Sequence, residues 1–320
     1  MAAGSQKTKA LIDSFPEQIR TGYELGKGIS LHKPSKVVFC GMGGSAIAGS
    51  LLLPFLEGIV PAVSNRYYGL PKFIDKKALV VLISYSGNTE ETIATFGEAL
   101  AAKFTMVVVT SGGELEKLAI ANKVPVIKLP ADMPPRASLG FQFFALLRLF
   151  VENKLLSIPD ISGVANFAED KSVEELAKKI AKECKGTVPL IYASEPNGAV
   201  AYRWKTQFNE NSKVHAFFHV LPELNHNEIL GYTKTFAKTL TLFLDYPDDH
   251  ERVRKRVLVT QELIKPSKSI VIDIKGSSPL ERFAYVIHLG DLITYYLAEE
   301  LKIDPYPVPV IERLKEELKK

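Results

Sequence analysis

The chain has 320 residues, enough for two domains of ordinary size that each bury a hydrophobic core. Its composition, 46% hydrophobic and 24% charged, is typical of a globular protein and excludes a disordered chain. The net charge of +4 comes from dispersed residues, without the Lys/Arg block and interleaved aromatics that bind nucleic acid. We therefore expect no nucleic-acid partner, whereas a mild positive bias suits a small anionic ligand.

The cysteines and the apolar runs indicate the compartment. Cys40 and Cys184 match no metal-binding or redox spacing, and so few cysteines favour the reducing cytoplasm. No apolar run approaches the ~20 residues that span a bilayer, so a membrane partner is not expected. The segment Met1–Gln18 lacks the apolar core of a secretory signal.

In the first half of the chain, apolar runs alternate with helix-like segments. The runs are rich in Val and Ile, as in strands that are buried on both faces. The predicted strands are Lys36–Cys40, Pro61–Arg66 (the weakest), Ala78–Ser84, Phe104–Thr110 and Val124–Leu129. The predicted helices are Ser45–Leu56, Glu90–Lys103, Glu114–Ala121 and Ser138–Asn153. This alternation predicts a parallel sheet that is covered by helices.

The second half repeats this alternation. Its predicted helices are Ser172–Cys184, Ala199–Glu210, Asp248–Ile264, Pro279–Leu301 and Pro309–Lys319. Its predicted strands are Thr187–Ser194, Lys213–His219, Lys238–Asp245 and Ser269–Ile274. The expected fold class is therefore α/β, with two similar domains in tandem, residues 1–153 and 154–320. Ligands of such folds bind beyond the carboxyl ends of the strands.

A glycine-rich turn, Gly41–Gly49 (GMGGSAIAG), directly follows the first predicted strand. Glycines at a strand-to-helix turn let backbone N–H groups approach an anion, and the helix N-terminus adds partial positive charge. A dinucleotide site is the competing interpretation, but Ser64–Arg66 offers no acidic residue for a ribose hydroxyl. Because Arg66 suits a 2′-phosphate, an NADP oxidoreductase stays open, as does a tight turn without a ligand.

A second loop, Ser84–Thr92 (SYSGNTEET), follows a later predicted strand. Its short hydroxyl side chains around a glycine form a compact set of donors for a phosphate. The alternative is a capping box, with Asn88 as N-cap and Glu91 reaching back to it. The two interpretations are compatible, because one helix start can cap itself and still expose its hydroxyls to a phosphate. Two such loops in one domain, each after a strand, indicate a phosphate site more strongly than one.

Together the GMGGS and SYSGNTEET motifs resemble those of the sugar isomerase (SIS) domain. Three further motifs narrow the resemblance: Pro134–Gly140 (PPRASLG), Asn209–Lys213 (NENSK) and Glu223–Glu228 (ELNHNE). The ordered set is similar to that of the bifunctional phosphoglucose/phosphomannose isomerases, which are known mainly from archaea. The resemblance implies two tandem SIS-type domains and an enzyme that interconverts glucose 6-phosphate and fructose 6-phosphate, with mannose 6-phosphate as a further substrate.

The resemblance also implies roles for individual residues. The substrate phosphate would bind to Gly44, Ser45, Ser84, Ser86 and Thr89. Arg136 would stabilise the enediolate, Glu210 would be the base, and His226 would open the sugar ring. Lys315 would be the catalytic or substrate lysine of the C-terminal helix. In such enzymes the histidine is expected to reach the site from the partner subunit, which implies a homodimer, and we expect no cofactor.

The chemistry of an aldose–ketose isomerisation agrees with these roles. One carboxylate can take a proton from a carbon and return it to the neighbouring carbon, and such acid/base groups contribute ~10²–10⁴-fold. A fixed cation such as an arginine stabilises the negative charge of the intermediate. Histidine exchanges protons near neutral pH, as ring opening requires.

A metal-dependent alternative finds little support in the sequence. His215 and His219 are four residues apart, but in a strand this spacing puts them ~13 Å apart. No H-E-x-x-H motif or His/Cys cluster is present, so we expect no metal.

Two rival functions and one departure from the family remain. A non-catalytic SIS regulator that senses a phosphosugar would keep the phosphate loops but would not need Glu210, Arg136 or His226. An amino-sugar phosphate isomerase or lyase would be a related enzyme. The departure is Val308, where the family has a threonine that is linked to accepting the mannose epimer. Val308 therefore puts the mannose activity in question.

Overall fold

The computed structural model describes residues 3–158, 161–167, 172–234, 237–265 and 267–318. The chain forms two compact units. We call Ser14–Asn166 the N unit, and Met1–Asp13 together with Phe167–Lys320 the C unit. The predicted division into residues 1–153 and 154–320 stays a prediction.

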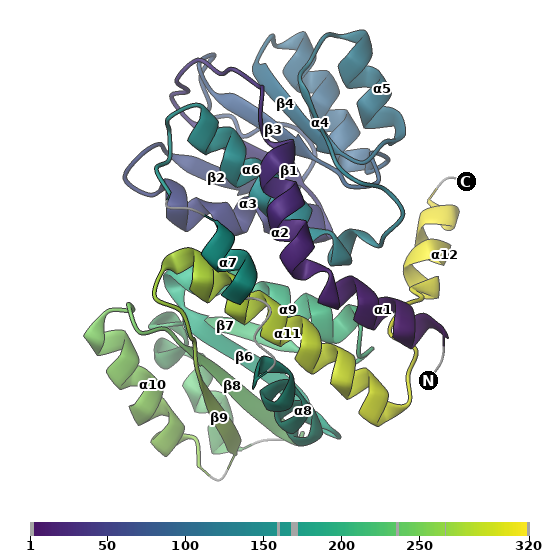
Figure 1. Ribbon diagram of the computed structural model, residues 1–320. Helices are drawn as coiled ribbons and strands as arrows, with labels where there is room; N and C mark the ends of the chain where they lie inside the picture. Colours follow the sequence, from purple (N-terminus) through teal and green to yellow (C-terminus); the bar gives the residue numbers. More distant parts are fainter. Residues whose placement is uncertain (1–2, 159–160, 168–171, 235–236, 266, 319–320) are drawn as a thin grey trace. The chain divides into compact units, whose positions relative to one another are not determined.

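The N unit contains one parallel sheet of five strands in the order β2-β1-β3-β4-β5 (Figure 1). The strands are β1 (Val37–Gly41), β2 (Ala62–Asn65), β3 (Leu79–Ile83), β4 (Thr105–Thr110) and β5 (Val126–Lys128). The helices are α2 (Phe15–Leu25), α3 (Gly43–Leu56), α4 (Glu90–Ala101), α5 (Gly113–Ala121), η1 (Pro135–Ala137) and α6 (Leu139–Glu152). Helix α7 (Ser162–Phe167) lies where the N unit ends.

The C unit contains a parallel sheet of four strands in the order β7-β6-β8-β9. The strands are β6 (Val188–Ser194), β7 (Phe217–Leu221), β8 (Thr239–Asp245) and β9 (Lys268–Asp273). The helices are α1 (Ala3–Asp13), α8 (Ser172–Cys184), α9 (Gly198–Glu210), α10 (Glu251–Leu263), α11 (Pro279–Leu301) and α12 (Pro309–Glu317). The short 3₁₀ turns of this unit are η2 (Glu195–Asn197), η3 (Glu223–His226) and η4 (Glu228–Thr233).

Strand β1 illustrates why these apolar runs become central strands. Alternate residues of β1 point to opposite faces of the sheet. Val38 and Cys40 pack in a core cluster with Phe96 of α4. Phe39 points the other way, against Gly49 of α3 and the ring of Phe150, 5.9 Å away in α6. Both faces are covered by helices, so the strand must be apolar throughout.

The predicted fold class is confirmed: each half of the chain forms a parallel sheet flanked by helices. In the described part of the chain, no helix is both long and apolar enough to cross a membrane. Two N-terminal helices, α1 and α2, were not predicted. Helix α1 joins the C unit, where the Ser5 hydroxyl donates to the Tyr295 hydroxyl of α11 at 3.1 Å.

One predicted strand begins too early. The sequence predicts a strand over Lys213–His219, whereas β7 covers Phe217–Leu221. Lys213 has a φ of +57°, a left-handed conformation that does not fit a strand. The preceding Ser212 donates from its hydroxyl to the carbonyl of Thr294 in α11 at 2.6 Å. The bond to α11 and the left-handed backbone keep residues 212 and 213 out of the sheet, so β7 begins later than predicted.

Candidate active site

The two glycine-containing loops of the N unit meet at one point of the sheet. Strands β1 and β3 are adjacent and parallel, with Gly41 opposite Ile83, so the loops that follow them share an edge. The chain runs from β1 to β2 on one side of β1 and then crosses to β3 on its other side. This edge is therefore the topological switch point, where ligands of open α/β sheets bind.

The loop backbones require glycine at two positions. Gly43 begins α3 with a φ of +52°, and Gly87 has a φ of +66°. A Cβ atom on Gly87 would lie 1.7 Å from the carbonyl oxygen of Gly112. Neither α3 nor α4 has a side-chain cap from its N-cap residue, Met42 or Thr89. The first N–H groups of both helices therefore have no acceptor from the N-cap side chain. They lie where the loops end, at the same end of the sheet.

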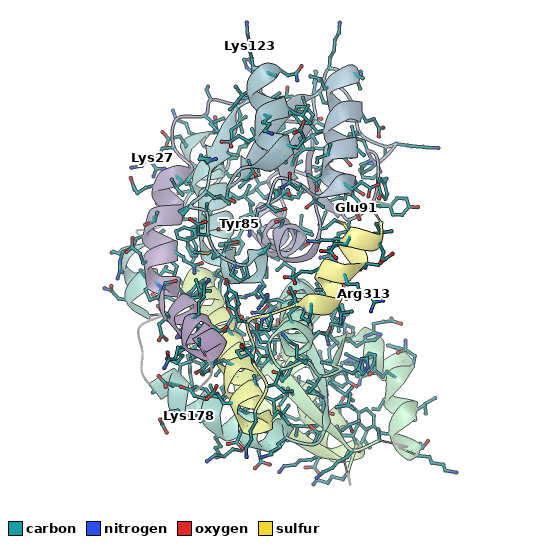
Figure 2. All side chains as sticks on the ribbon, turned by 90° about the vertical axis from the view of Figure 1, so that its right-hand side faces the viewer. Lys27, Tyr85, Glu91, Lys123, Lys178 and Arg313 are labelled. Atoms are coloured by element: carbon teal, nitrogen blue, oxygen red, sulfur yellow. The ribbon has the colours of Figure 1, made fainter. Side chains whose placement is uncertain are left out.

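The predicted phosphate-binding hydroxyls are oriented by hydrogen bonds that leave O–H donors. Ser45 is buried, and its Oγ accepts from the backbone N–H of Tyr85 at 3.1 Å (Tyr85 is labelled in Figure 2). Ser86 is exposed, and its Oγ accepts from the N–H of Asn88 at 3.3 Å. A hydroxyl that accepts still carries its own hydrogen. Each of these two serines can therefore donate to an anion.

Ser84 and Thr89 form a pair. Their hydroxyl oxygens are 2.9 Å apart and share one hydrogen bond, in which either can be the donor. Ser84 is fully buried, and Thr89 is partly exposed. Because only one of the two hydrogens is used, the pair keeps one O–H donor. The loops thus offer O–H donors, as an anion site requires.

The alternative interpretation of the second loop, a capping box with Asn88 as N-cap, is wrong. The N-cap of α4 is Thr89, not Asn88. Instead, the Oδ1 atom of Asn88 accepts from the N–H of Glu114 in α5 at 3.0 Å. Asn88 thereby fixes the second loop to the start of a neighbouring helix.

A third loop, Ser111–Gly113, follows β4 and supports the second loop, and it was not predicted from the sequence. The Ser111 hydroxyl donates to the carbonyl of Tyr85 at 2.6 Å. Gly113 has a φ of +75°, and a Cβ there would lie 2.4 Å from the carbonyl of Ser86. The signal was visible, because Thr110–Gly113 (TSGG) is again a strand followed by glycines and a helix.

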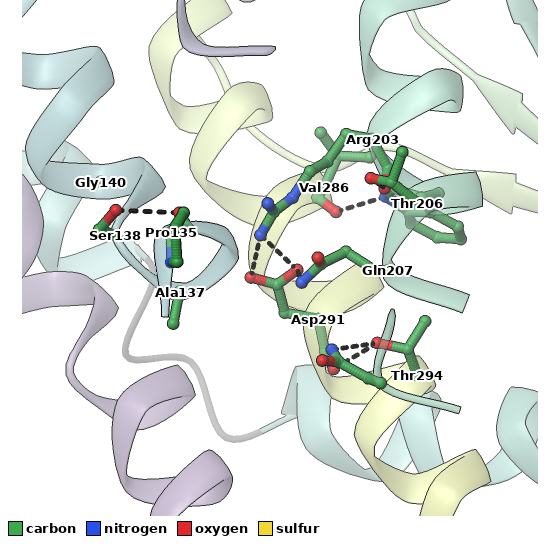
Figure 3. A network of polar contacts seen from close by, with 12 residues as sticks. Pro135, Ala137, Ser138, Gly140, Arg203, Thr206, Gln207, Val286, Asp291 and Thr294 are labelled. Carbon is green, nitrogen blue, oxygen red and sulfur yellow. Dashed lines mark hydrogen bonds and ion pairs between the residues drawn. The ribbon is translucent and has the colours of Figure 1, made fainter. Parts of the chain in front are cut away.

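Arg136 lies in the same unit, next to the first loop. A Cβ on Gly44 would lie 3.1 Å from the carbonyl oxygen of Pro135 and 3.4 Å from the Cα of Arg136. Arg136 is only 5% exposed. The Ser138 hydroxyl donates to Pro135 at 2.9 Å (Figure 3), and Gln142 donates to Ser138. The structure thus brings the arginine and all five predicted phosphate residues into one unit.

The other predicted catalytic residues belong to the C unit. Glu210 is partly exposed at the end of α9. His226 is exposed in η3, and the neighbouring Asn225 donates to Thr260 of α10 at 2.8 Å. Lys315 is exposed on α12, a helix without buried residues; Figure 2 labels Arg313 of the same helix.

A polar seam of Arg203 and Gln207 in α9 and Asp291 in α11 connects these helices within the C unit, and it was not predicted from the sequence (Figure 3). Arg203 is 1% exposed, and its Nη2 donates to both carboxylate oxygens of Asp291, at 2.9 and 3.0 Å. Gln207 donates to the same carboxylate at 2.7 Å. A buried charge requires such a partner. The available signal was Asp291 within an otherwise apolar stretch of a long predicted helix.

The described residues contain neither a metal-binding cluster nor a reactive thiol. There, no group of three or more His, Cys, Asp or Glu side chains is arranged to hold a metal ion. Both cysteines are buried and free. Burial raises the pKa of the Cys40 and Cys184 thiols to about 12, which keeps them protonated and unreactive near neutral pH.

Comparison with known proteins places the chain in a family. Residues 173–318 match the family model of the bacterial phospho-glucose isomerase C-terminal SIS domain. A bifunctional phosphoglucose/phosphomannose isomerase from Caldicellulosiruptor bescii is 40% identical, covering 95% of this chain and 97% of the relative. A D-glucosamine-6-phosphate 4-epimerase from Sulfolobus acidocaldarius is 32% identical over 88% of each chain.

The fold is shared more widely. The crystal structure of a hypothetical protein from Thermus thermophilus has a TM-score of 0.79 at 15% identity, covering 99% of this chain and 93% of the other. At that identity the likeness concerns the fold alone. The 40% identity to the Caldicellulosiruptor bescii isomerase over nearly the whole length shows the family, and it confirms the resemblance predicted from the motifs. The chain belongs to the family of the bifunctional phosphoglucose/phosphomannose isomerases.

Proposed function

We propose that this protein is an aldose–ketose isomerase that interconverts glucose 6-phosphate and fructose 6-phosphate, and also accepts mannose 6-phosphate, through an enediol. The observation that carries the proposal is the set of oriented O–H donors at the switch point of the N unit, in a chain 40% identical to a bifunctional isomerase. A phosphate that binds there anchors the substrate without taking part in the reaction.

Glu210 would move the proton. Its carboxylate takes a proton from C2 of the aldose and returns it to C1, and the reverse reaction uses the same group. Arg136 would stabilise the negative oxygen of the enediolate, because a guanidinium keeps its charge at every physiological pH. Lys315 would contact the substrate from the C-terminal helix.

His226 would open the sugar ring, and we propose that it does so in the active site of a partner subunit of a homodimer. Strand β7 supports this assignment, because Glu210 precedes the strand and His226 follows it. Five strand residues span ~13 Å, and the two residues flank opposite ends of this strand in the chain. One site can combine them when the histidine comes from a second copy. We also propose a cytoplasmic location, which suits the free cysteines.

A coupled assay with glucose, fructose and mannose 6-phosphates tests the proposal directly. Turnover of glucose 6-phosphate to fructose 6-phosphate by the purified protein is the expected result. Binding of these sugars without turnover would instead identify a phosphosugar-binding regulator. Glucosamine 6-phosphate belongs in the same assay because of the epimerase relative, whose lower identity, 32% against 40%, favours the isomerase.

The phosphate loops give a first prediction. Ser84→Ala or Thr89→Val is expected to raise KM for each hexose 6-phosphate about tenfold, with kcat nearly unchanged, because the remaining hydroxyl loses the hydrogen bond that orients it toward a group that does not react. Steady-state kinetics measures both constants. Thr95→Val is the matched control. Thr95 is buried in α4, the helix that follows this loop, and its hydroxyl donates to the carbonyl of Glu91 at 2.8 Å. Unchanged KM in both loop variants would reject the phosphate assignment.

The epimer preference gives a second prediction. Val308 is the N-cap of α12 and is partly exposed. We expect the parent protein to turn over mannose 6-phosphate more slowly than glucose 6-phosphate, and Val308→Thr to raise the mannose rate selectively. Val310→Thr, two residues away at an 81% exposed position, serves as control. Equal rates with both epimers in the parent would remove the reason for this prediction.

A further inference from the structure

The residues around Glu210 form a set of anchors. Asn209 donates from Nδ2 to the carbonyl of Val214 at 2.8 Å. Asn211 donates to the hydroxyl of Thr294 at 3.1 Å, and Ser212 donates to the Thr294 carbonyl at 2.6 Å. The residues on both sides of Glu210 are therefore tied down, so the backbone that carries its carboxylate has little freedom.

Lys213 closes the same turn. Its Nζ donates to the carbonyl of Glu210 and, at 3.2 Å, to the carbonyl of Pro305. The carbonyls at the end of a helix lack partners within the helix, and a lysine there satisfies one of them. Lys213 thus connects the last turn of α9 to the segment that leads into α12.

The anchors converge on one turn of α11. Asp291 accepts from Arg203 and Gln207, and its own carbonyl accepts from the Thr294 hydroxyl at 3.0 Å (Figure 3). Gln207 and Asn211 lie four residues apart and therefore on one face of the helix end. Both reach α11, at Asp291 and Thr294. The two helices approach closely here, since a Cβ on Gly290 would lie 2.3 Å from the indole nitrogen of Trp204.

We propose that Asp291 and Thr294 are positioning residues for the base, and that they act through Gln207 and Asn211 to fix the last turn of α9 and the direction of the Glu210 carboxylate. This inference rests on the proposed function, because it assumes that Glu210 transfers the proton. A base must be held close to its target atom, and a displacement of ~1 Å can cost as much as about 100-fold in rate. Asp291 and Thr294 supply that rigidity through their hydrogen bonds to Gln207 and Asn211.

The test uses Thr294→Val, which is nearly the same size but removes the hydroxyl that binds Asn211 and Asp291. Substitution of Asp291 is avoided, since it leaves the buried Arg203 charge without this carboxylate and endangers the fold. We expect kcat to fall about tenfold while KM for glucose 6-phosphate changes less than about twofold. Thr294→Ser is expected to restore the rate. Gln207→Leu, which removes the donor to Asp291, should repeat the loss, and it decides the question if Thr294→Val does not fold.

Two controls separate positioning from general destabilisation. Thr241→Val removes another fully buried hydroxyl of the C unit, which pairs with Tyr232 at 2.8 Å, and should leave kcat unchanged at a comparable loss of thermal stability. In a Glu210→Gln background, Thr294→Val should have no further effect on the residual rate, because the group that it positions is gone. An equal loss from Thr241→Val, or an additive loss in the Glu210→Gln background, would overturn the inference.

The outcomes also distinguish this inference from the proposed function. If the parent protein turns over no hexose 6-phosphate, or if Glu210→Gln is fully active, the proposed function or its base is wrong. If the parent is active and Glu210→Gln is impaired, but Thr294→Val and Gln207→Leu keep the parental kcat, only the positioning role fails.

Discussion

Replacement of Glu210 by glutamine is expected to lower kcat at least about 100-fold, with KM for glucose 6-phosphate largely unchanged. Glutamine keeps the size and the hydrogen-bonding shape of the side chain but cannot accept the proton from C2. The anchors of the helix end, among them Asn211 on Thr294, contact neighbouring residues and remain in the variant. Solvent deuterium exchange into the substrate and the coupled assay both measure the proton transfer.

Two other carboxylates near the predicted motifs provide controls. Glu223 accepts from Asn227 at 2.7 Å, and Glu228 accepts from the Tyr192 hydroxyl at 2.6 Å. Their bonds give them structural roles, so Glu223→Gln and Glu228→Gln should cost much less activity. Near-parental turnover of Glu210→Gln would refute the assignment of the base. If Glu228→Gln were inactive instead, the mechanism would stand with a different residue.

The same variant tests the contribution of a partner subunit. When Glu210→Gln and His226→Ala proteins are mixed and exchange subunits, each mixed dimer would combine one intact glutamate with the intact histidine of the other copy. In a symmetric dimer, random exchange predicts about a quarter of the parental activity. If Glu210 and His226 act within one subunit, the mixture should be no more active than its components.

Gly87→Ala is expected to lower kcat/KM by a factor on the order of 100, mostly through KM. A left-handed residue with a side chain costs ~1–2 kcal/mol. In addition, the new Cβ would lie 1.7 Å from the carbonyl of Gly112, so the second loop must move. That movement displaces Ser86 and separates Thr89 from Ser84. Binding of inorganic phosphate, measured by calorimetry, should weaken in parallel.

Gly97→Ala provides the matched control in the same helix, α4. A Cβ on Gly97 would meet no atom within 4 Å, and the residue is exposed. Alanine is the better helix former by ~1 kcal/mol, so this variant should be slightly more stable and fully active. Parental phosphate affinity in Gly87→Ala would mean that the second loop does not hold the phosphate.

The amino-acid sequence by itself determined most of the elements and the two glycine-containing loops after β1 and β3. Buried parallel strands must be apolar throughout, so runs such as Ala78–Ser84 identify their strands without any knowledge of contacts. Glycines with a positive φ are equally local, because the backbone at Gly43 and Gly87 dictates the residue type. The ordered motifs sufficed for the family, whose roles for Glu210 and His226 stay predictions.

Only the tertiary structure decided which long-range partners these elements have. Asn88 could cap its own helix or hold Glu114 of another, and the choice depends on how close α5 lies. A strand over Lys213–His219 fits the local pattern. The hydrogen bond from Ser212 to α11, however, keeps the start of this range out of the sheet, and β7 begins only at Phe217. Likewise, the Asp291 seam joins residues more than eighty positions apart. Such contacts depend on helix packing, which short-range periodicity does not encode.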